Sequence, residues 1–202
     1  MTKVKICGVT SVGDALMAAE AGADAIGLNF FPGGVRCLSI DTAEAIAAAV
    51  PSGVCRVGVF VDAPRAQIEE TARRVGLDAV QFHGAEPVQF CRDWALTTIK
   101  AVRVGSPDAL AAAAAYPVDF VLADAYVEGQ RGGTGQRVPL EWLIGVPPAR
   151  LIAAGGLTPD NVAEVVRALK PAAVDVASGV EKTPGVKDPE KVRRFIANAR
   201  HA

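Results

Sequence analysis

Two side chains that could move protons end apolar runs at distant places in the sequence. Cys7 ends the run VKIC and precedes Gly8, and Asp124 follows the run FVLA. A thiol with the ordinary pKa near 8.5 is only about 3% ionised at pH 7, but a nearby helix N-terminus could lower that pKa and make Cys7 a general base. A carboxyl at the edge of an apolar pocket can keep its proton, so Asp124 is a candidate general acid. A buried structural cysteine and a loop-capping aspartate are the alternatives.

The stretch 151–185 could bind a phosphate group. It reads as strand, glycine turn, helix, strand and a second small-residue turn, with Gly155 and Gly156 in the first turn and Ser178 and Gly179 in the second. Thr158 is expected to cap the helix between the strands. Backbone amides left unpaired at two such turns could converge on one anion. The alternative is that these glycines only make tight turns.

Other polar side chains fall at or just after the ends of predicted strands. Arg36 follows the glycine-rich segment PGGV, so its planar fork could reach a substrate carboxylate, although a plain surface arginine is the alternative. His83 could be catalytic or simply packed in a turn. The glycine-rich loop 131–135 (RGGTG) is predicted to act as a lid. The further candidates at strand ends are Asn29, Asp62, Gln81, Arg103 and Asp175.

Alternating strand and helix patterns must position these side chains. Strands are expected at 4–7, 24–30, 54–61, 78–82, 97–102 and 120–124, with two more inside the stretch 151–185. Helices are expected at 11–21, from about 41, at 66–75, from about 88 to 94, at 107–115, 140–144 and 189–199, and between the last two strands. Eight such units predict an α/β fold in which residues 1–202 form a single-domain (β/α)8 TIM barrel. The alternative is an open doubly wound sheet, whose first turn would carry G-x-G-x-x-G where this chain has CGVTS.

Composition excludes several classes of partner. The net charge of −1 gives no basic surface for nucleic acid, and no apolar run is long enough to span a membrane. The chain enters its first predicted strand at once, which favours a cytoplasmic location. Its four cysteines form no C-x-x-C pair and lie far from histidines, so neither a metal nor a disulfide is expected. A monomer or weak homodimer is expected, since no exposed apolar stripe stands out.

Six segments in order resemble the phosphoribosylanthranilate isomerase family of tryptophan biosynthesis. They cover nearly the whole chain, and the first and last are highly specific together. The segments are VKICGVT (4–10), VGVFVD (57–62), VQFHGAEP (80–87), LADA with GGTG (122–135), IAAGGLTPDNV (152–162) and VDVASGVEKTPGVKD (174–188).

The resemblance implies a barrel enzyme that uses neither cofactor nor metal and acts on a small phosphosugar. Its reaction would be the Amadori rearrangement of N-(5-phosphoribosyl)anthranilate to carboxyphenylamino-deoxyribulose phosphate. By position, the family's general base falls on Cys7, its general acid on Asp124 and its carboxylate-binding arginine on Arg36. The other matches are a phosphate site at Gly155, Gly156, Ser178 and Gly179, a pocket carboxylate at Asp175, and pocket-lining side chains at Gln81 and His83.

Two rival functions can be compared with this interpretation. An aminoaldose isomerase of histidine synthesis would be expected to use aspartates as both acid and base, and Cys7 argues against it. A catalytically idle phospholigand-binding barrel would be expected to lack the acid or the base. Both candidate residues are present here, which favours the enzyme.

Overall fold

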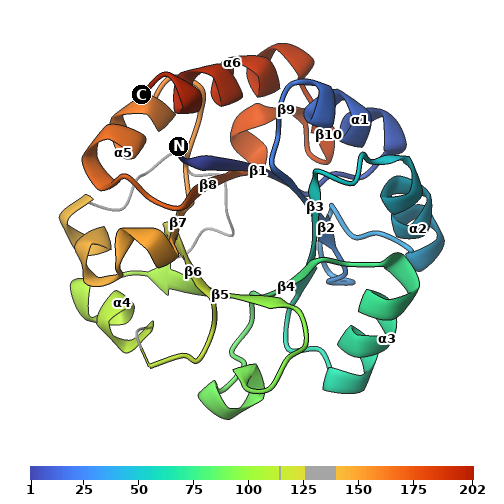
Figure 1. Ribbon diagram of the computed structural model, residues 1–202, viewed down its shortest axis with the longest axis horizontal. Coiled ribbons are helices and arrows are strands. Elements are labelled where there is room, and N and C mark those ends of the chain that lie inside the picture. The colour runs from blue at the N-terminus through green and yellow to red at the C-terminus, as the bar shows by residue number, and fades with distance from the viewer. Residues whose placement is uncertain (114, 126–139) are drawn as a thin grey trace.

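Parallel strands close into a barrel in the order of the sequence (Figure 1). The structure is a computed structural model, and it describes residues 1–113, 115–125 and 140–202. Within these residues the barrel strands are β1 (Lys3–Cys7), β2 (Ala25–Asn29), β3 (Cys55–Phe60), β4 (Ala79–Phe82), β5 (Thr97–Val104), β6 (Phe120–Ala125), β7 (Leu151–Ala153) and β8 (Ala173–Val176). The predicted (β/α)8 barrel is therefore confirmed, and the doubly wound alternative is wrong.

Helices surround the barrel on its outside (Figure 1). They are α1 (Val12–Glu20), α2 (Ile40–Ala49), α3 (Arg65–Val75), α4 (Pro107–Ala113), α5 (Val162–Leu169) and α6 (Pro189–Arg200), with short 3-10 helices at Val88–Cys91, Leu140–Gly145, Pro148–Arg150 and Ser178–Val180. An antiparallel hairpin of β9 (Glu181–Thr183) and β10 (Val186–Lys187), which the sequence did not predict, follows the last barrel strand. Among the described residues, none of the helices is long and apolar enough to cross a membrane.

Short polar side chains determine where several helices begin. The Ser11 hydroxyl accepts a hydrogen bond from the backbone N–H of Asp14 at the start of α1, and Ser39 does the same for Thr42 in α2. Asp188 caps α6 by accepting from two backbone N–H groups, and Pro189 occupies the first turn of that helix. These bonds satisfy amides that have no partner within the helix. Local sequence therefore fixes these boundaries within one or two residues of the predicted ones.

The segment after β4 differs from the prediction of a helix reaching Trp94. Only Val88–Cys91 is helical, and it is a single 3-10 turn. Phe82, Phe90 and Trp94 form an aromatic cluster with ring centroids 5.1–5.7 Å apart. The Arg65 guanidinium lies 4.4 Å from the Trp94 ring centroid and donates to two backbone carbonyls of the same segment. Tertiary packing therefore replaces the expected helix.

Successive side chains of a barrel strand point alternately outward, into a core beneath the helices, and inward, into a smaller core inside the barrel. Even-numbered residues of β1 pack under the helices, and Val4 and Ile6 are fully buried there. Odd-numbered residues of β1 face the inside of the barrel, beside an inner cluster that includes Val57, Ile99 and Leu122. Lys5 and Cys7 therefore point inward from the same strand.

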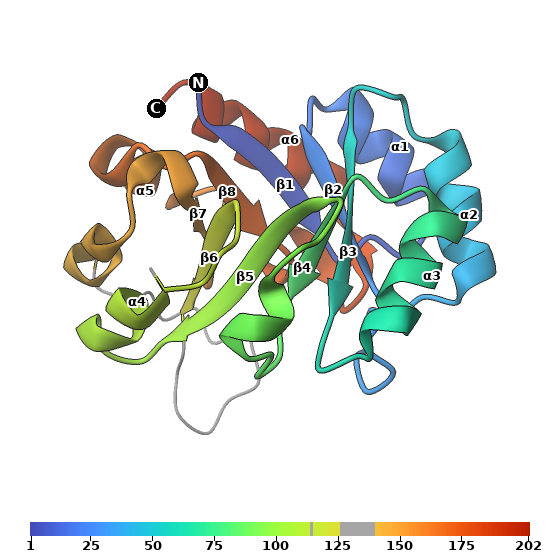
Figure 2. The same ribbon diagram turned by 60° about the horizontal axis from the view of Figure 1, so that its bottom comes forward.

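The first and last strands close the ring. Lys5 of β1 lies in register with Asp175 of β8, and Cys7 lies in register with Gly27 of β2. Figure 2 shows the N- and C-termini side by side at the end of the barrel where the strands begin. The strands run from there towards the opposite end, which we call the mouth. In barrels of this class the residues that carry out chemistry lie at that end.

Candidate active site

Cys7 lies at the carboxyl end of β1, at the mouth of the barrel. The side chain of Cys7 is partly exposed, and Gly27 on the neighbouring strand leaves room for it. A Cβ atom on Gly27 would lie 2.6 Å from the Cys7 Sγ atom and 3.1 Å from Lys5 Nζ. Only a glycine on β2 therefore lets the thiol and the ammonium occupy this position.

Burial and the charges of neighbouring side chains determine the pKa of the Cys7 thiol. Burial raises the pKa of the Cys7 thiol, the nearby Lys5 ammonium lowers it, and Asp175 raises it, with a net rise. The net shift is thus opposite in direction to the fall that a helix N-terminus could cause, and the main charge that lowers the pKa is that of Lys5. Sequence reading missed Lys5, since a lysine in a strand is usually assigned to an exposed face.

Asp124, near the end of β6, lies next to an imidazole. Its Oδ2 atom is 3.5 Å from Nε2 of His83, which follows β4. On the other side of the ring, Nδ1 of His83 lies 2.8 Å from Nε2 of Gln81. Gln81 is fully buried, and within the described part of the chain its Oε1 atom has no hydrogen-bond partner. The three side chains form a line that runs from the barrel interior to the Asp124 carboxyl.

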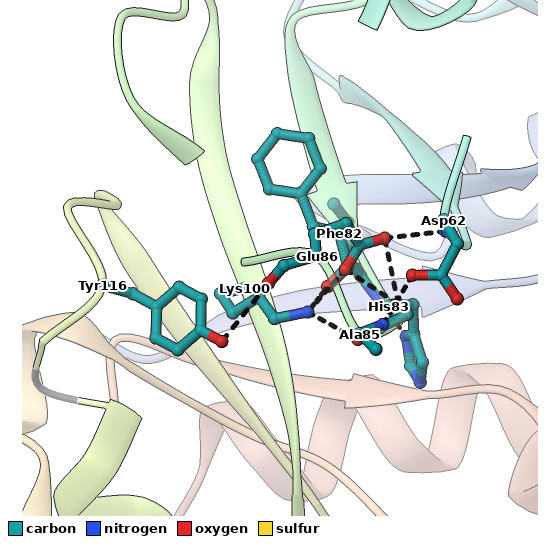
Figure 3. A network of polar contacts seen from close by, with 9 residues as sticks. Asp62, Phe82, His83, Ala85, Glu86, Lys100 and Tyr116 are labelled. Atoms are coloured by element: carbon teal, nitrogen blue, oxygen red, sulfur yellow. Dashed lines mark hydrogen bonds and ion pairs between the residues drawn. The ribbon is translucent and has the colours of Figure 1, made fainter. Parts of the chain in front are cut away.

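A buried ion pair fixes the loop that carries His83 (Figure 3). Lys100 Nζ lies 2.5 Å from an oxygen of Glu86 and donates to the carbonyl of Gly84 at 2.7 Å. Glu86 also accepts hydrogen bonds from the backbone N–H groups of Asp62 and Gly84. The loops after β3 and β4 are thereby tied to β5. His83 is held in place from its backbone as well as from its ring.

Three predicted candidates have local structural roles or remain exposed. The Asp62 carboxylate accepts a hydrogen bond from the backbone N–H of Ala85 at 2.7 Å, and Asn29 accepts one from Phe31 at 2.8 Å. Arg103, on β5, has an exposed side chain at the mouth. The predicted lid at 131–135 lies outside the described residues.

Arg36 is held at the mouth by a carboxylate that sequence reading missed. Its Nε and Nη2 atoms donate to the two oxygens of Glu181 at 2.7 and 2.6 Å. Glu181 also receives a hydrogen bond from the buried Lys187 at 2.9 Å. A guanidinium has five N–H donors, so those not bound to Glu181 remain for an anion. No local signal pairs residues 145 positions apart, which is why Glu181 was not predicted.

The turns after β7 and β8 lie directly against each other. Gly155 and Gly156 have φ angles of 79° and 66°, which residues with a side chain rarely adopt. A Cβ atom on Gly179 would lie only 1.9 Å from the backbone oxygen of Leu157. Among the described residues, no hydrogen bond is made by the backbone amides of Gly155 and Gly156. Ser178 and Gly179 begin a 3-10 turn, and the first amides of such a turn have no partner within it. Two sets of donors therefore adjoin one another.

The predicted helix cap at Thr158 is wrong. Helix α5 begins at Val162, and Asn161 precedes it. The Asn161 side chain accepts from the Thr158 N–H at 2.8 Å and donates to the Gly156 carbonyl at 2.9 Å. This bridge gives the chain an extra turn before the helix starts. The amides at the mouth after β7 therefore belong to the turn itself and not to the N-terminus of α5.

Replacing Gly179 with alanine should separate these two turns. The new methyl group would clash with the Leu157 backbone, so the turn at 178–180 must move, and we expect KM for a phosphorylated substrate to rise about tenfold or more. Steady-state kinetics measures this, with a thermal melt to establish folding. Gly53→Ala is the matched control, since no atom lies within 4 Å of its added Cβ. An unchanged KM in a folded Gly179→Ala protein would contradict the predicted phosphate site.

The closed parallel barrel, with a thiol, a carboxyl and a guanidinium at its mouth, defines an enzyme of the (β/α)8-barrel class. Residues 4–198 match the family model described as N-(5'phosphoribosyl)anthranilate (PRA) isomerase. The chain therefore belongs to the N-(5'-phosphoribosyl)anthranilate isomerase family, whose members serve tryptophan biosynthesis. The family suggested by the sequence motifs is confirmed.

Individual relatives agree over their full lengths. An N-(5'-phosphoribosyl)anthranilate isomerase from Geobacter sp. (strain M21) is 48% identical over 201 residues, covering 99% of this chain and 98% of that protein. The crystal structure of the isomerase from Thermotoga maritima has a TM-score of 0.92 and 38% identity, with 100% of both chains covered. A family structure in complex with reduced 1-(o-carboxyphenylamino)-1-deoxyribulose 5-phosphate has a TM-score of 0.87 and 39% identity, again with 100% of both chains covered.

Proposed function

We propose that this chain converts N-(5'-phosphoribosyl)anthranilate to 1-(2-carboxyphenylamino)-1-deoxyribulose 5-phosphate, with Asp124 as general acid and Cys7 as general base. The observation that carries this proposal is the placement of both side chains at strand ends of one barrel mouth, in a chain that is similar over its full length to named isomerases. Two inward-facing proton carriers at one mouth suit a reaction that needs one proton added and another removed.

The proposed steps need only groups that this chain supplies. Asp124 gives its proton to the ring oxygen of the ribose, the ring opens, and the nitrogen forms a Schiff base with C1′. The iminium withdraws electrons from the neighbouring carbon, so the C2′ proton becomes acidic. The Cys7 thiolate accepts that proton, and the resulting enolamine tautomerises to the ketone. Each proton transfer could contribute about 10²–10⁴-fold in rate.

The remaining mouth residues would bind the two ends of the substrate. Arg36, oriented by Glu181, would face the anthranilate carboxylate with its free donors, and the turns at 155–156 and 178–179 would hold the phosphate. Asp175 would act in the pocket through Lys5, to which it is bound. As part of the same proposal, the enzyme acts in the cytoplasm as a monomer or weak homodimer, without metal, cofactor, nucleic-acid or membrane partner.

Gln81 would orient the acid through His83. Its amide N–H donates to Nδ1 of His83, which leaves the ring proton on Nε2, facing Asp124. Gln81→Leu should therefore lower kcat about five- to tenfold, since one orienting hydrogen bond is lost. Its melting temperature should not fall, because the substitution also removes a buried oxygen that lacks a partner.

Nitrogen-15 NMR of the histidine ring measures the tautomer directly. The chain has two histidines, so a His201→Gln background leaves a single ring to observe. The Nε2–H tautomer should dominate in the parent and mix with the Nδ1–H form in Gln81→Leu. An identical tautomer and an unchanged kcat in both proteins would contradict this role for Gln81.

The activity itself is tested with the labile substrate made in situ from anthranilate and phosphoribosyl pyrophosphate by a transferase. Its anthranilate fluorescence should decay when the purified chain is added, in proportion to the amount of chain. Asp124→Asn serves as a folded control that should leave the signal nearly unchanged. A folded wild-type chain that also leaves the fluorescence unchanged would reject the proposed function.

A further inference from the structure

Lys5 is a buried cation on the floor of the mouth that takes no part in the proposed proton transfers. Only 3% of its surface is exposed, and its Nζ atom lies 2.7 Å from an oxygen of Asp175 on β8. Lys5 and Cys7 are two residues apart on β1, so both side chains point into the barrel. Both Nζ and the Cys7 Sγ atom lie against Gly27, within 3.1 and 2.6 Å of the position a Cβ would take there.

The other buried lysines of the described chain make a clear contrast. Lys100 donates to a Glu86 oxygen and to the carbonyls of Gly84 and Phe82. Lys187 donates to Glu181 and to the carbonyl of Ala177. An ammonium has three N–H donors, and in these two lysines protein oxygens take up two or three of them. Within the described residues the one oxygen bonded to the Lys5 ammonium is that of Asp175, and the rest of the group faces the thiol.

A structural ion pair is a poor explanation for this arrangement. Removing two charges from water costs free energy that their mutual attraction often only balances, so a buried pair seldom stabilises a fold compared with apolar residues. An opposite charge within about 4–6 Å of a titratable group, however, strongly favours its charged form. Lys5 is placed to act in this way on Cys7, and Asp175 moderates the effect.

Four charged groups face the thiol from the elements around it. Lys5 on β1 and Asp175 on β8 have the largest charge effects on it, Lys187 of β10 has a smaller one, and Arg36 from the loop after β2 also interacts with it. Lys187 and Arg36 share the single carboxylate of Glu181, so this group of three keeps one net positive charge, but the effect of Lys187 on the thiol is smaller than that of Lys5. The largest charge effect on Cys7 therefore comes from Lys5, and Asp175 opposes it in part.

We propose that Lys5 is a positioning residue that stabilises the thiolate form of Cys7. Its ammonium lies beside the sulfur, so the negative charge left on Cys7 by deprotonation has a fixed counter-charge inside the barrel. This inference rests on the proposed role of Cys7 as general base. It adds that the base is reactive because of a lysine two residues earlier on the same strand.

The test follows the reactivity of Cys7 and does not depend on turnover. Iodoacetamide reacts with thiolates, and mass spectrometry of the peptide that contains Cys7 distinguishes it from the other three cysteines. In Lys5→Met the midpoint of the alkylation rate against pH should move upward by about 1–3 pH units, and alkylation at neutral pH should slow about tenfold or more. Lys3→Met is the matched control, because Lys3 lies on the same strand but is exposed and pairs with Asp24 at 3.3 Å. Its midpoint should stay at the wild-type value.

A second variant covers the case in which Lys5→Met leaves Asp175 unpaired and fails to fold. The double variant Lys5→Met/Asp175→Asn removes both charges and should still show an upward, smaller movement of the midpoint. A midpoint equal to that of wild type in folded Lys5→Met, or in the double variant if the single one does not fold, would overturn the proposal. Wild-type turnover is measured in parallel, so a chain that lacks isomerase activity but shows the shifted midpoint would refute the proposed function and leave the role of Lys5 standing.

Discussion

Cys7→Ser should lower kcat by about 10²–10⁴-fold and leave KM nearly unchanged. A serine hydroxyl fills the same space beside Gly27, so substrate binding is preserved, but it is far too weak a base to take a proton from carbon. The interaction that is lost acts mainly in the transition state. Steady-state fluorescence decay with the substrate made in situ measures both constants.

The pH dependence of the same reaction gives a second result. Burial raises the pKa of the Cys7 thiol above its ordinary value, and Lys5 opposes that rise only in part. At neutral pH most of the thiol is therefore protonated, and kcat/KM should increase with pH as the thiolate fraction grows. This rising limb should be absent in Cys7→Ser. The exposed Cys37, replaced by serine, is the control and should behave as wild type. Near-normal turnover in Cys7→Ser would eliminate the thiol as the base.

Asp124→Asn should cause a loss of similar size, about 10²–10⁴-fold in kcat. Asparagine keeps the shape of the side chain beside Nε2 of His83, which lies 3.5 Å from Asp124 Oδ2 in the parent. It has no acidic proton to give to the ring oxygen, so ring opening should become the slow step. Product formation in single-turnover experiments, followed over time, measures that step directly.

The effect of Asp124→Asn on KM distinguishes a general acid from a carboxylate that only binds substrate. If Asp124 acts as an acid, KM should change by less than about threefold, because the lost interaction belongs to the transition state. Asp108→Asn, a change of the same charge at the exposed start of α4, should leave both constants unchanged. A variant of Asp124 with normal kcat and greatly raised KM would show that this carboxyl binds substrate and does not protonate it.

The sequence predicted the barrel and the strand ends well because both depend on local patterns. Apolar runs of four to eight residues followed by small or polar residues mark the ends of buried parallel strands. Cys7, Asp124 and His83 each stand at or just after such an end, and the structure places them at the mouth. Helix boundaries were equally accurate where a serine or aspartate caps the first turn, as in α1 and α6.

The errors and omissions depend on specific side-chain contacts that the sequence patterns do not show. Thr158 is a residue type that often caps helices. The Asn161 side chain, however, bridges the Thr158 N–H and the Gly156 carbonyl, so the helix begins only at Val162. Glu181 and Lys5 have partners 145 and 170 residues away in the sequence, so no local pattern pairs them. The helix expected before Trp94 is replaced by an aromatic cluster. In each case a specific side-chain contact outweighs the local preference of the sequence.

Because β1 pairs with β8, the surroundings of the Cys7 thiol are completed only after the last barrel strand has been synthesised. The residues that align Lys5 with Asp175 are 170 positions apart, and one of the two strands is among the last to be synthesised. A chain still on the ribosome, or one truncated before Ala173, would carry an open sheet with two unpaired edges and a cysteine of unremarkable reactivity. Closure of the barrel would thus be required before Cys7 reaches its full reactivity, so an incomplete chain would lack the activity of the finished enzyme.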